Sequence, residues 1–163
     1  MHSRIFGIIK KEEYEALVRE EGMAPEMPVS AFEENLPEVM DYVNGDTDFD
    51  ADFDRLITHL HNRASKFEYD PSTHIIKFQA GFKEEYFEKS WEQIKELLET
   101  PNAFDGFCNG LSGLVYKLTE AINDRYGFYI CNEHGWYDTM DDFIRYADIN
   151  TEYVVFGSID YHW

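Results

Sequence analysis

The sequence predicts a single α+β domain spanning residues 1–163, in which about five or six helices pack on a small, mainly antiparallel sheet. Three observations support this class. The length of 163 residues suits one domain, which buries about two-thirds of its unfolded surface. Helical and strand-like segments do not follow each other as regular βαβ units. Two of the predicted strands are joined by a short turn, which favours antiparallel pairing.

The first part of the chain is predicted to begin with a strand and to continue with helices. Residues 4–9 form an apolar run typical of a strand, and residues 11–21 place apolar side chains on one helical face. Gly22 ends this helix. After a loop, residues 30–43 are expected to form a helix interrupted at Pro37, because proline suits the first turn of a helix and not its interior.

An aspartate-rich segment precedes the next predicted helix. From Phe53 onwards the apolar residues follow a helical stripe to about Ser65, so the last aspartates are expected to flank or cap the helix start, where the dipole favours carboxylates. Residues 66–70 and 74–78 alternate apolar and polar side chains around a turn that contains proline. This pattern predicts a β-hairpin.

The C-terminal half repeats the helical pattern and closes with strands. Its expected elements are a helix at 83–99, a loop at 101–110, a helix at 111–124, a strand at 128–131, a helix at 137–147 and a strand at 153–159. In the 83–99 helix, glutamates occupy most positions outside the apolar stripe. One face of this helix is therefore expected to pack and the rest to be acidic.

The charge of the chain is strongly one-sided. Asp and Glu number 33 against 14 Lys and Arg, which gives a formal net charge of −19. Hydrophobic residues make up 44% and aromatic residues 17%, so the chain is not a disordered acidic tail. This excess is larger than the roughly 2 to 8 charges that keep a small domain soluble. It indicates a basic partner and disfavours nucleic acid and anionic membranes as direct ligands.

The N-terminal region and the cysteines indicate a cytoplasmic protein. The apolar run at residues 5–9 gives way to charged residues too early for a signal peptide, and no later run approaches a membrane span. Cys108 and Cys131 have neither CxxC nor zinc-knuckle spacing. Two such cysteines in a chain of this size are expected to be ordinary thiols in a reducing compartment.

Two lines of carboxylates are the candidate partner-binding residues. In an extended strand, residues two apart lie on one side and advance about 6.6 Å, which is comparable to the spacing of phosphates along a nucleic-acid strand. Alternate aspartates are therefore expected to present a row of negative charge: Asp46, Asp48, Asp50, Asp52 and Asp54. Glutamates of the 83–99 helix add a second line: Glu84, Glu85, Glu88, Glu92 and Glu96. The alternatives are a solvated acidic loop with a helix cap, a weak cation site, and a merely soluble helix face.

Metal and catalytic motifs find little support. Aligned with an EF-hand calcium loop, the aspartate segment has Ala51 where the glycine belongs and Ile57 where the bidentate glutamate belongs. His59 and His61 are two residues apart, and on a helix they point about 200° apart, so they cannot hold one ion. The chain has no phosphate loop and no GxSxG motif. No enzyme activity, cofactor or metal is therefore expected.

The function expected from these observations is inhibition by binding. In charge, size and lack of a catalytic motif, the chain resembles the DNA-mimic inhibitors of restriction or CRISPR nucleases that phages and mobile elements carry; the resemblance is one of composition only. It implies a protein that occludes a basic nucleic-acid-binding surface on its target. The first alternative is an immunity protein for a nuclease toxin. The second is a metal-dependent hydrolase assembled from scattered residues such as His74, His134 and Asp138.

Overall fold

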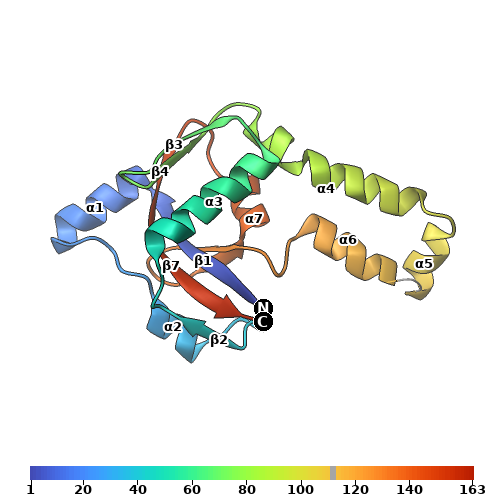
Figure 1. The fold of residues 1–163 in the computed structure, drawn as a ribbon, viewed down its shortest axis with the longest axis horizontal. Helices are drawn as coiled ribbons and strands as arrows, with labels where there is room; N and C mark the ends of the chain where they lie inside the picture. The colour runs from blue at the N-terminus through green and yellow to red at the C-terminus, as the bar shows by residue number, and fades with distance from the viewer. Residues whose placement is uncertain (111–112) are drawn as a thin grey trace.

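The chain folds around a sheet whose two central strands come from its two ends. A computed structural model describes residues 1–110 and 113–163. Strands β1 (His2–Lys10) and β7 (Glu152–His162) pair antiparallel along their length, so the N- and C-termini lie side by side (Figure 1). Both are apolar and largely buried, as central strands are expected to be. The molecule is a single α+β domain, as predicted.

Five shorter strands complete a mixed, mostly antiparallel seven-stranded sheet. The strand order is β3-β4-β7-β1-β5-β6. Strand β2 is outside this order and pairs with the C-terminal end of β7, whereas β4 pairs with its N-terminal end. Strands β1 and β5 run parallel. The bounds of these strands are β2 (Tyr42–Asn44), β3 (Phe67–Asp70), β4 (Ile75–Phe78), β5 (Tyr129–Cys131) and β6 (Tyr137–Thr139). The β3–β4 hairpin confirms the strand pair predicted around the proline-containing turn.

Seven helices belong to the described part of the chain, against the five or six expected. They are α1 (Lys11–Glu21), α2 (Val29–Glu34), α3 (Phe49–Arg63), α4 (Phe82–Glu99), α5 (Ala103–Asn109), α6 (Leu114–Ile122) and α7 (Met140–Tyr146). Local sequence sets several of their ends. Gly22 ends α1 with a left-handed backbone, and Thr139 caps α7 by accepting a hydrogen bond from the Asp142 N–H.

Four sequence predictions are corrected by the fold. The helix expected to restart after Pro37 is absent from the described residues; the chain instead enters strand β2. The expected loop at 101–110 contains helix α5. The final helix begins at Met140 rather than at residue 137, because the preceding three residues pair with β5 as strand β6. The helix expected at 111–124 begins at Leu114 as α6, and residues 111–112 lie outside the described part of the chain.

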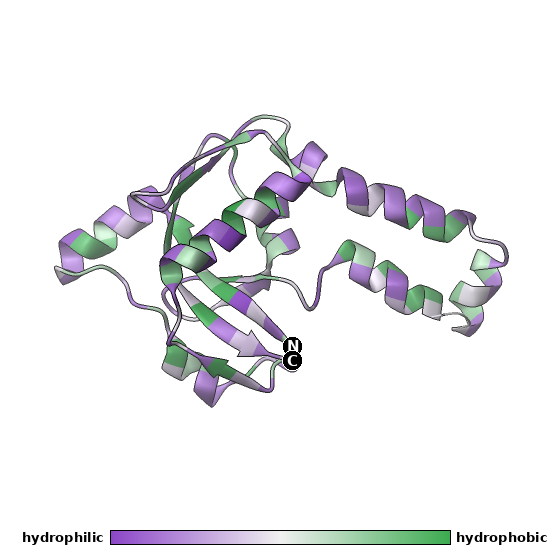
Figure 2. Ribbon diagram, in the orientation of Figure 1, coloured by the Kyte–Doolittle hydropathy of each residue, from purple (hydrophilic) through white to green (hydrophobic). Residues whose placement is uncertain are grey.

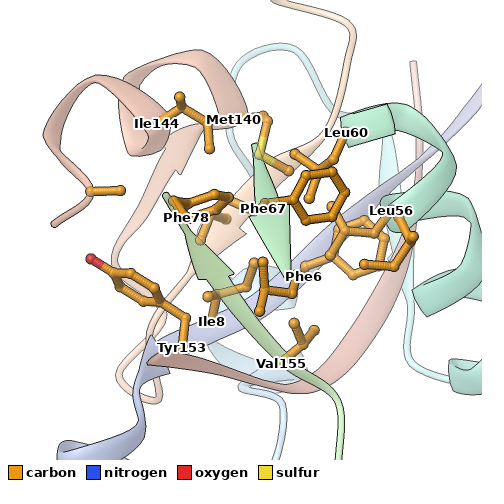
Figure 3. Close-up of a cluster of buried hydrophobic side chains, with 14 of the residues drawn as sticks. Phe6, Ile8, Leu56, Leu60, Phe67, Phe78, Met140, Ile144, Tyr153 and Val155 are labelled. Atoms are coloured by element: carbon orange, nitrogen blue, oxygen red, sulfur yellow. The ribbon is translucent and has the colours of Figure 1, made fainter. Parts of the chain in front are cut away.

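Aromatic and aliphatic side chains form the larger core on one face of the sheet. Phe6 and Val155 from the sheet meet Leu56 of α3 and Ile144 of α7 in this cluster, and all four are at most 1% exposed (Figure 3). Phe82 and Tyr86, from the first turns of α4, join the same cluster and are fully buried. The stripe of α3 thus faces the sheet because its apolar residues recur every three to four positions.

A second core lies on the opposite face and is covered by α2 and the segment around it. Ile5, adjacent to Phe6 on β1, points to this side, as strand alternation requires, and packs with Phe32 of α2. Gly7 and Gly157 face each other across β1 and β7, and a Cβ at either would collide with Met27. The glycine pair therefore lets the loop before α2 lie directly on the sheet backbone.

Helices α4, α5 and α6 extend beyond the sheet as a projection (Figure 1). We call the described residues of 91–122 the helical arm, and the remainder of the described chain the sheet body. Within the arm, α4 and α6 lie alongside each other, and α5 joins their far ends. Hydrophobic residues lie on all three helices of the arm (Figure 2). No helix in the described residues is long and apolar enough to cross a membrane.

Candidate partner-binding surface

The row of alternate aspartates expected at residues 46–54 does not form. Helix α3 begins at Phe49, and Asp48 is its N-cap, whose side chain accepts a hydrogen bond from the Ala51 N–H at 3.2 Å. Residues two apart on a helix point about 200° apart, so the later aspartates face different directions. The extended geometry is therefore wrong. The helix also begins at Phe49 and not near Phe53, so the cap is Asp48 and not, as was expected, one of the last aspartates. The segment forms a helix start and not a strand because carboxylates there accept hydrogen bonds from free backbone N–H groups and interact favourably with the helix dipole.

Asp52 is buried and ties three elements together. It is 1% exposed and accepts hydrogen bonds from Arg4 on β1 at 2.8 Å, from Arg55 at 2.8 Å and from the Ser158 hydroxyl on β7 at 2.9 Å. Arg4 also bridges Asp160. Asp52 is thus a structural ion-pair partner that a binding protein cannot reach, although the sequence placed it among the partner-binding residues.

The other four predicted aspartates are exposed near the start of α3. They are Asp46, Asp48, Asp50 and Asp54. His74 lies 3.0 Å from Asp50. In the described residues, no Lys or Arg lies within 4 Å of the carboxylates of the other three. The loop before α3 is held against the sheet, since the Thr47 hydroxyl donates to the Ser158 carbonyl at 3.2 Å.

A wider acidic surface surrounds these aspartates. Residues 20–54 contain twelve Asp and Glu and no Lys or Arg. This segment therefore contributes −12 to the net charge of −19. The exposed carboxylates on α2, beside β2 and at the start of α3, which we call the acidic edge, are Glu33, Glu34, Glu38, Asp41, Asp46, Asp48, Asp50 and Asp54. Figure 1 shows α2 and β2 together below the start of α3. The first four were missed from the sequence, although the absence of cationic residues over 35 positions was the signal that marks them.

The glutamates predicted on the second line lie elsewhere. Glu84, Glu88, Glu92 and Glu96 are exposed on α4. Helix α3 has 15 residues and is about 22 Å long, and α4 lies towards its C-terminal end (Figure 1). The acidic edge lies at the other end of α3. The two predicted lines are therefore separate surfaces and not one continuous patch.

Glu85 is half-buried and engaged by residues outside its own helix, whereas Glu92 pairs with Lys95 of the same helix, at 2.6 Å. Its carboxylate accepts hydrogen bonds from the Ser65 N–H at 2.8 Å and the Ser65 hydroxyl at 3.0 Å, and Lys66 lies 3.1 Å away. The Ser65 N–H and the Lys66 ammonium together lower the pKa of Glu85 to about 2. Glu85 therefore joins the end of α3 to the start of α4.

A buried polar cluster lies where α4 leaves the sheet body. The Tyr86 hydroxyl donates to Asp141 at 2.9 Å, so the ring nitrogen of His59, 3.2 Å away, must donate to the Tyr86 oxygen. Burial, and to a smaller extent the positive charge of Arg63, lower the pKa of His59 to about 4. The Arg63 guanidinium lies 5.0 Å from the centre of the Tyr86 ring. Tyr86 thus links His59 to Asp141, and burial keeps His59 neutral at pH 7.

The residues named for a metal-dependent hydrolase do not come together. His74 lies at the start of β4, whereas His134 and Asp138 lie in the turn before β6 and on β6. Four strand spacings separate β4 from β6, or about 19 Å. Among the residues that the structure describes, no group of three or more His, Cys, Asp and Glu is placed to hold a metal ion.

Comparison with known proteins finds no match to this chain among protein-family models, curated proteins or solved structures. Any functional assignment therefore rests on its own residues. Two of its surfaces are unusual by physical criteria: the acidic edge for its charge and the helical arm for its exposed apolar side chains.

Proposed function

We propose that the protein is an acidic inhibitor that occludes a basic, nucleic-acid-binding surface of a target protein, and that the acidic edge makes this contact. The observation that carries the proposal is the run of twelve carboxylates without a Lys or Arg over residues 20–54. Eight of the twelve are the exposed members of the acidic edge. In this proposal the protein acts by occupying the surface, without catalysis or a cofactor.

The physical argument is electrostatic. Carboxylates that are not paired with Lys or Arg create a negative potential that attracts a cationic groove over a distance of about a Debye length, or roughly 10 Å at 0.1 M salt. Such a field accelerates association and makes it sensitive to salt. A groove that binds nucleic acid already carries Lys and Arg for phosphates, so the same residues serve for carboxylates.

The acidic edge is also held in place by the fold, which favours binding over a mobile acidic tail. Phe32 anchors α2 and is 2% exposed, and β2 pairs with β7. The loop before α3 is fixed by Thr47, and the helix start by the Asp48 cap. Because little conformational entropy remains to be lost, the carboxylates bind at a lower cost than those of a disordered segment.

The test is affinity capture with two matched variants of the full chain. The first carries Asp46→Asn, Asp48→Asn and Asp54→Asn, which removes three charges while asparagine retains the capping role at residue 48. The control carries Glu12→Gln, Glu13→Gln and Glu15→Gln on α1, which removes the same charge from another exposed surface. Both are used beside the wild type on nuclease-treated lysate of the cells in which the gene occurs, at low and high salt.

We expect wild type and control to retain the same basic nucleic-acid-binding protein at low salt and to release it at high salt, with the acidic-edge variant retaining at least about tenfold less. The captured protein should lose DNA binding when the inhibitor is added. Equal capture by both variants overturns the role of the acidic edge. Recovery of no basic protein overturns the proposal itself. A captured restriction or CRISPR nuclease, as opposed to a toxin nuclease, distinguishes an anti-defence inhibitor from an immunity protein.

A further inference from the structure

Two of the eight carboxylates of the acidic edge contact a basic side chain, and in both cases that side chain is a histidine. His74 Nε2 lies 3.0 Å from Asp50, and His162 Nδ1 lies 3.1 Å from Asp41. Across residues 1–110 and 113–163, no Lys or Arg comes within 4 Å of a carboxylate of the acidic edge. The basic groups at this surface are therefore of the one kind whose charge ordinarily changes between pH 5 and 8.

Permanent cations pair with carboxylates elsewhere in the molecule. Lys10 and Lys11 pair with carboxylates near the start of β7, and Arg4 and Arg55 hold the buried Asp52. A Lys or Arg beside the acidic edge would cancel part of its charge at every pH. A histidine cancels charge only when it is protonated, so the strength of this surface can change with pH.

His74 is held in place against the start of α3. The centre of its ring lies 4.5 Å from that of Phe49 and 4.8 Å from that of Phe53. The charged group that α3 presents to it is Asp50, whose side chain is 88% exposed. Asp70 lies in the same turn as His74, where serine and threonine side chains donate to its carboxylate. Both carboxylates favour a positive charge on His74.

His162 has opposing charges around it, at the end of β7 beside the two termini (Figure 1). Its Nδ1 donates to Asp41, because a carboxylate only accepts, and its Nε2 lies 3.1 Å from the Met1 nitrogen. The His2 ring lies 5.1 Å away and pairs with Asp160. Asp41 favours a positive charge on His162, whereas the Met1 nitrogen and a protonated His2 oppose it. His74 is therefore expected to have the larger effect.

Protonation of the two histidines changes the charge that a partner meets. With both imidazoles neutral, the eight carboxylates give the acidic edge a charge of −8, and with both protonated the charge is −6. The carboxylates themselves stay ionised over this range, because Asp and Glu ordinarily titrate near pH 4. A cationic partner therefore binds the unprotonated form more tightly, and by linkage its binding releases protons from the histidines.

We propose that His74 and His162 make partner binding by the acidic edge dependent on pH, tighter at pH 8 than at pH 5.5, by neutralising Asp50 and Asp41 when protonated. The inference rests on the proposed function, because it concerns the regulation of the same surface. It adds that the inhibitor releases a cationic target as the pH falls.

The test is the affinity of the full chain for an oligoarginine peptide, measured by titration calorimetry at pH 8 and pH 5.5 and at constant low salt. Arginine keeps its charge over this range, so any change with pH comes from the protein. The variants are His74→Asn, chosen because asparagine tolerates the left-handed backbone at residue 74, and His162→Gln. The control is His134→Gln, which removes an exposed histidine that faces Glu133 outside the acidic edge.

We expect wild type and control to bind the peptide about fivefold more weakly at pH 5.5 than at pH 8. His74→Asn should reduce this loss to about twofold, and His162→Gln should reduce it less. All four proteins should bind equally at pH 8, where the histidines are neutral.

A further variant separates failure of this inference from failure of the proposed function. The triple variant of Asp46, Asp48 and Asp54 to asparagine should bind the peptide more weakly at both pH values. If it does, but the histidine variants keep the pH dependence of the wild type, the inference is overturned and the proposed function stands. If the triple variant binds as the wild type does, cations do not use the acidic edge, and both are overturned.

A second measurement covers the case in which His74→Asn does not fold, which circular dichroism at each pH reveals. Calorimetry of the wild type at pH 6.5, in two buffers of different ionisation enthalpy, counts the protons released when the peptide binds. We expect proton release, and less of it from His162→Gln. Binding without proton release would contradict the inference.

Discussion

The sheet body and the helical arm use aromatic side chains in opposite ways. In the body, Phe6, Phe82 and Tyr86 are fully buried, and their rings pack edge to face or tilted against neighbouring rings. In the arm, Phe104 and Phe107 are more than half exposed. Buried rings contribute to the free energy of folding in proportion to the apolar area that they remove from water, and exposed rings contribute little. The difference indicates that the rings of the body stabilise the fold, whereas Phe104 and Phe107 of the arm contribute little to it.

Helix α4 belongs to both regions, which makes the contrast instructive. Its first turns place Phe82 and Tyr86 in the main core, and its later turns carry Trp91 and Leu98 on the surface. Trp91 and Leu98 belong to the apolar stripe that the spacing predicted for residues 83–99, whereas Phe82 and Tyr86 do not. Periodicity therefore predicts that a helix has an apolar side, but the length of the neighbouring elements decides whether anything covers it.

The largest expected effect separates a core ring from an arm ring. Phe82→Ala should lower the free energy of unfolding by about 3–5 kcal/mol, because it leaves a cavity among buried aromatics. Phe104→Ala should change it by less than about 0.5 kcal/mol. Urea unfolding of each variant measures both values. Comparable losses at the two sites would mean that the arm contributes to the core and would remove the contrast.

Local chemistry explains which elements were predictable. The β3–β4 hairpin lies within one residue of its predicted bounds, since Asp70 accepts hydrogen bonds from Ser72 and Thr73 and fixes the turn. Strands β2 and β6 have three residues each and exist through pairing with β7 and β5. Such pairing is tertiary and leaves no periodic signal in so short a segment. Helix α5 was not predicted because glycine disfavours helix, and glycines lie within it and directly after it.

The sequence predicted only in part which of the candidate residues are exposed. Net charge alone indicated an acidic binding surface, and Asp46, Asp48, Asp50 and Asp54 are exposed as such a surface requires. Asp52 stands in the same alternating pattern, yet it is buried against Arg4 from the far end of the sequence. No local pattern reports a contact between residues 48 positions apart. The exposed apolar side of the arm was not predicted, because the sequences of α4 and α6 have the spacing of ordinary amphipathic helices.

A pH experiment probes the junction between the two regions. The pKa of His59 is lowered from 6.5 to about 4, so below pH 6.5 the unfolded chain takes up a proton that the folded chain refuses. This group's contribution should therefore reduce stability as the pH falls from 6.5 to 4, by up to about 3 kcal/mol, and leave it unchanged above pH 7.

The variant His59→Gln isolates this effect from the many carboxylates that titrate at lower pH. Glutamine retains a donor towards Tyr86 but does not titrate. The free energies of unfolding of the two proteins, measured from pH 7.5 to 4.5, should approach each other and then cross as the wild type loses stability. Parallel curves would show that the base of α4 is open to water, and the border between body and arm would then lie closer to the sheet.

The smallest effect compares two glutamates on α4, one in each region. Glu85 lies beside Ser65 and Lys66 in the body, and Glu96 is exposed on the arm. Because folding lowers the pKa of Glu85 from 4.5 to about 2, its carboxylate stabilises the fold above pH 4.5, and this contribution is lost as the pH falls towards 2. Glu85→Gln should therefore lower the urea midpoint at pH 7, and by less at pH 3.5, whereas Glu96→Gln should leave it unchanged at both. A fall of the midpoint with Glu96→Gln would mean that the arm holds its carboxylates as the body does, so those glutamates would be structural groups instead of free surface charge.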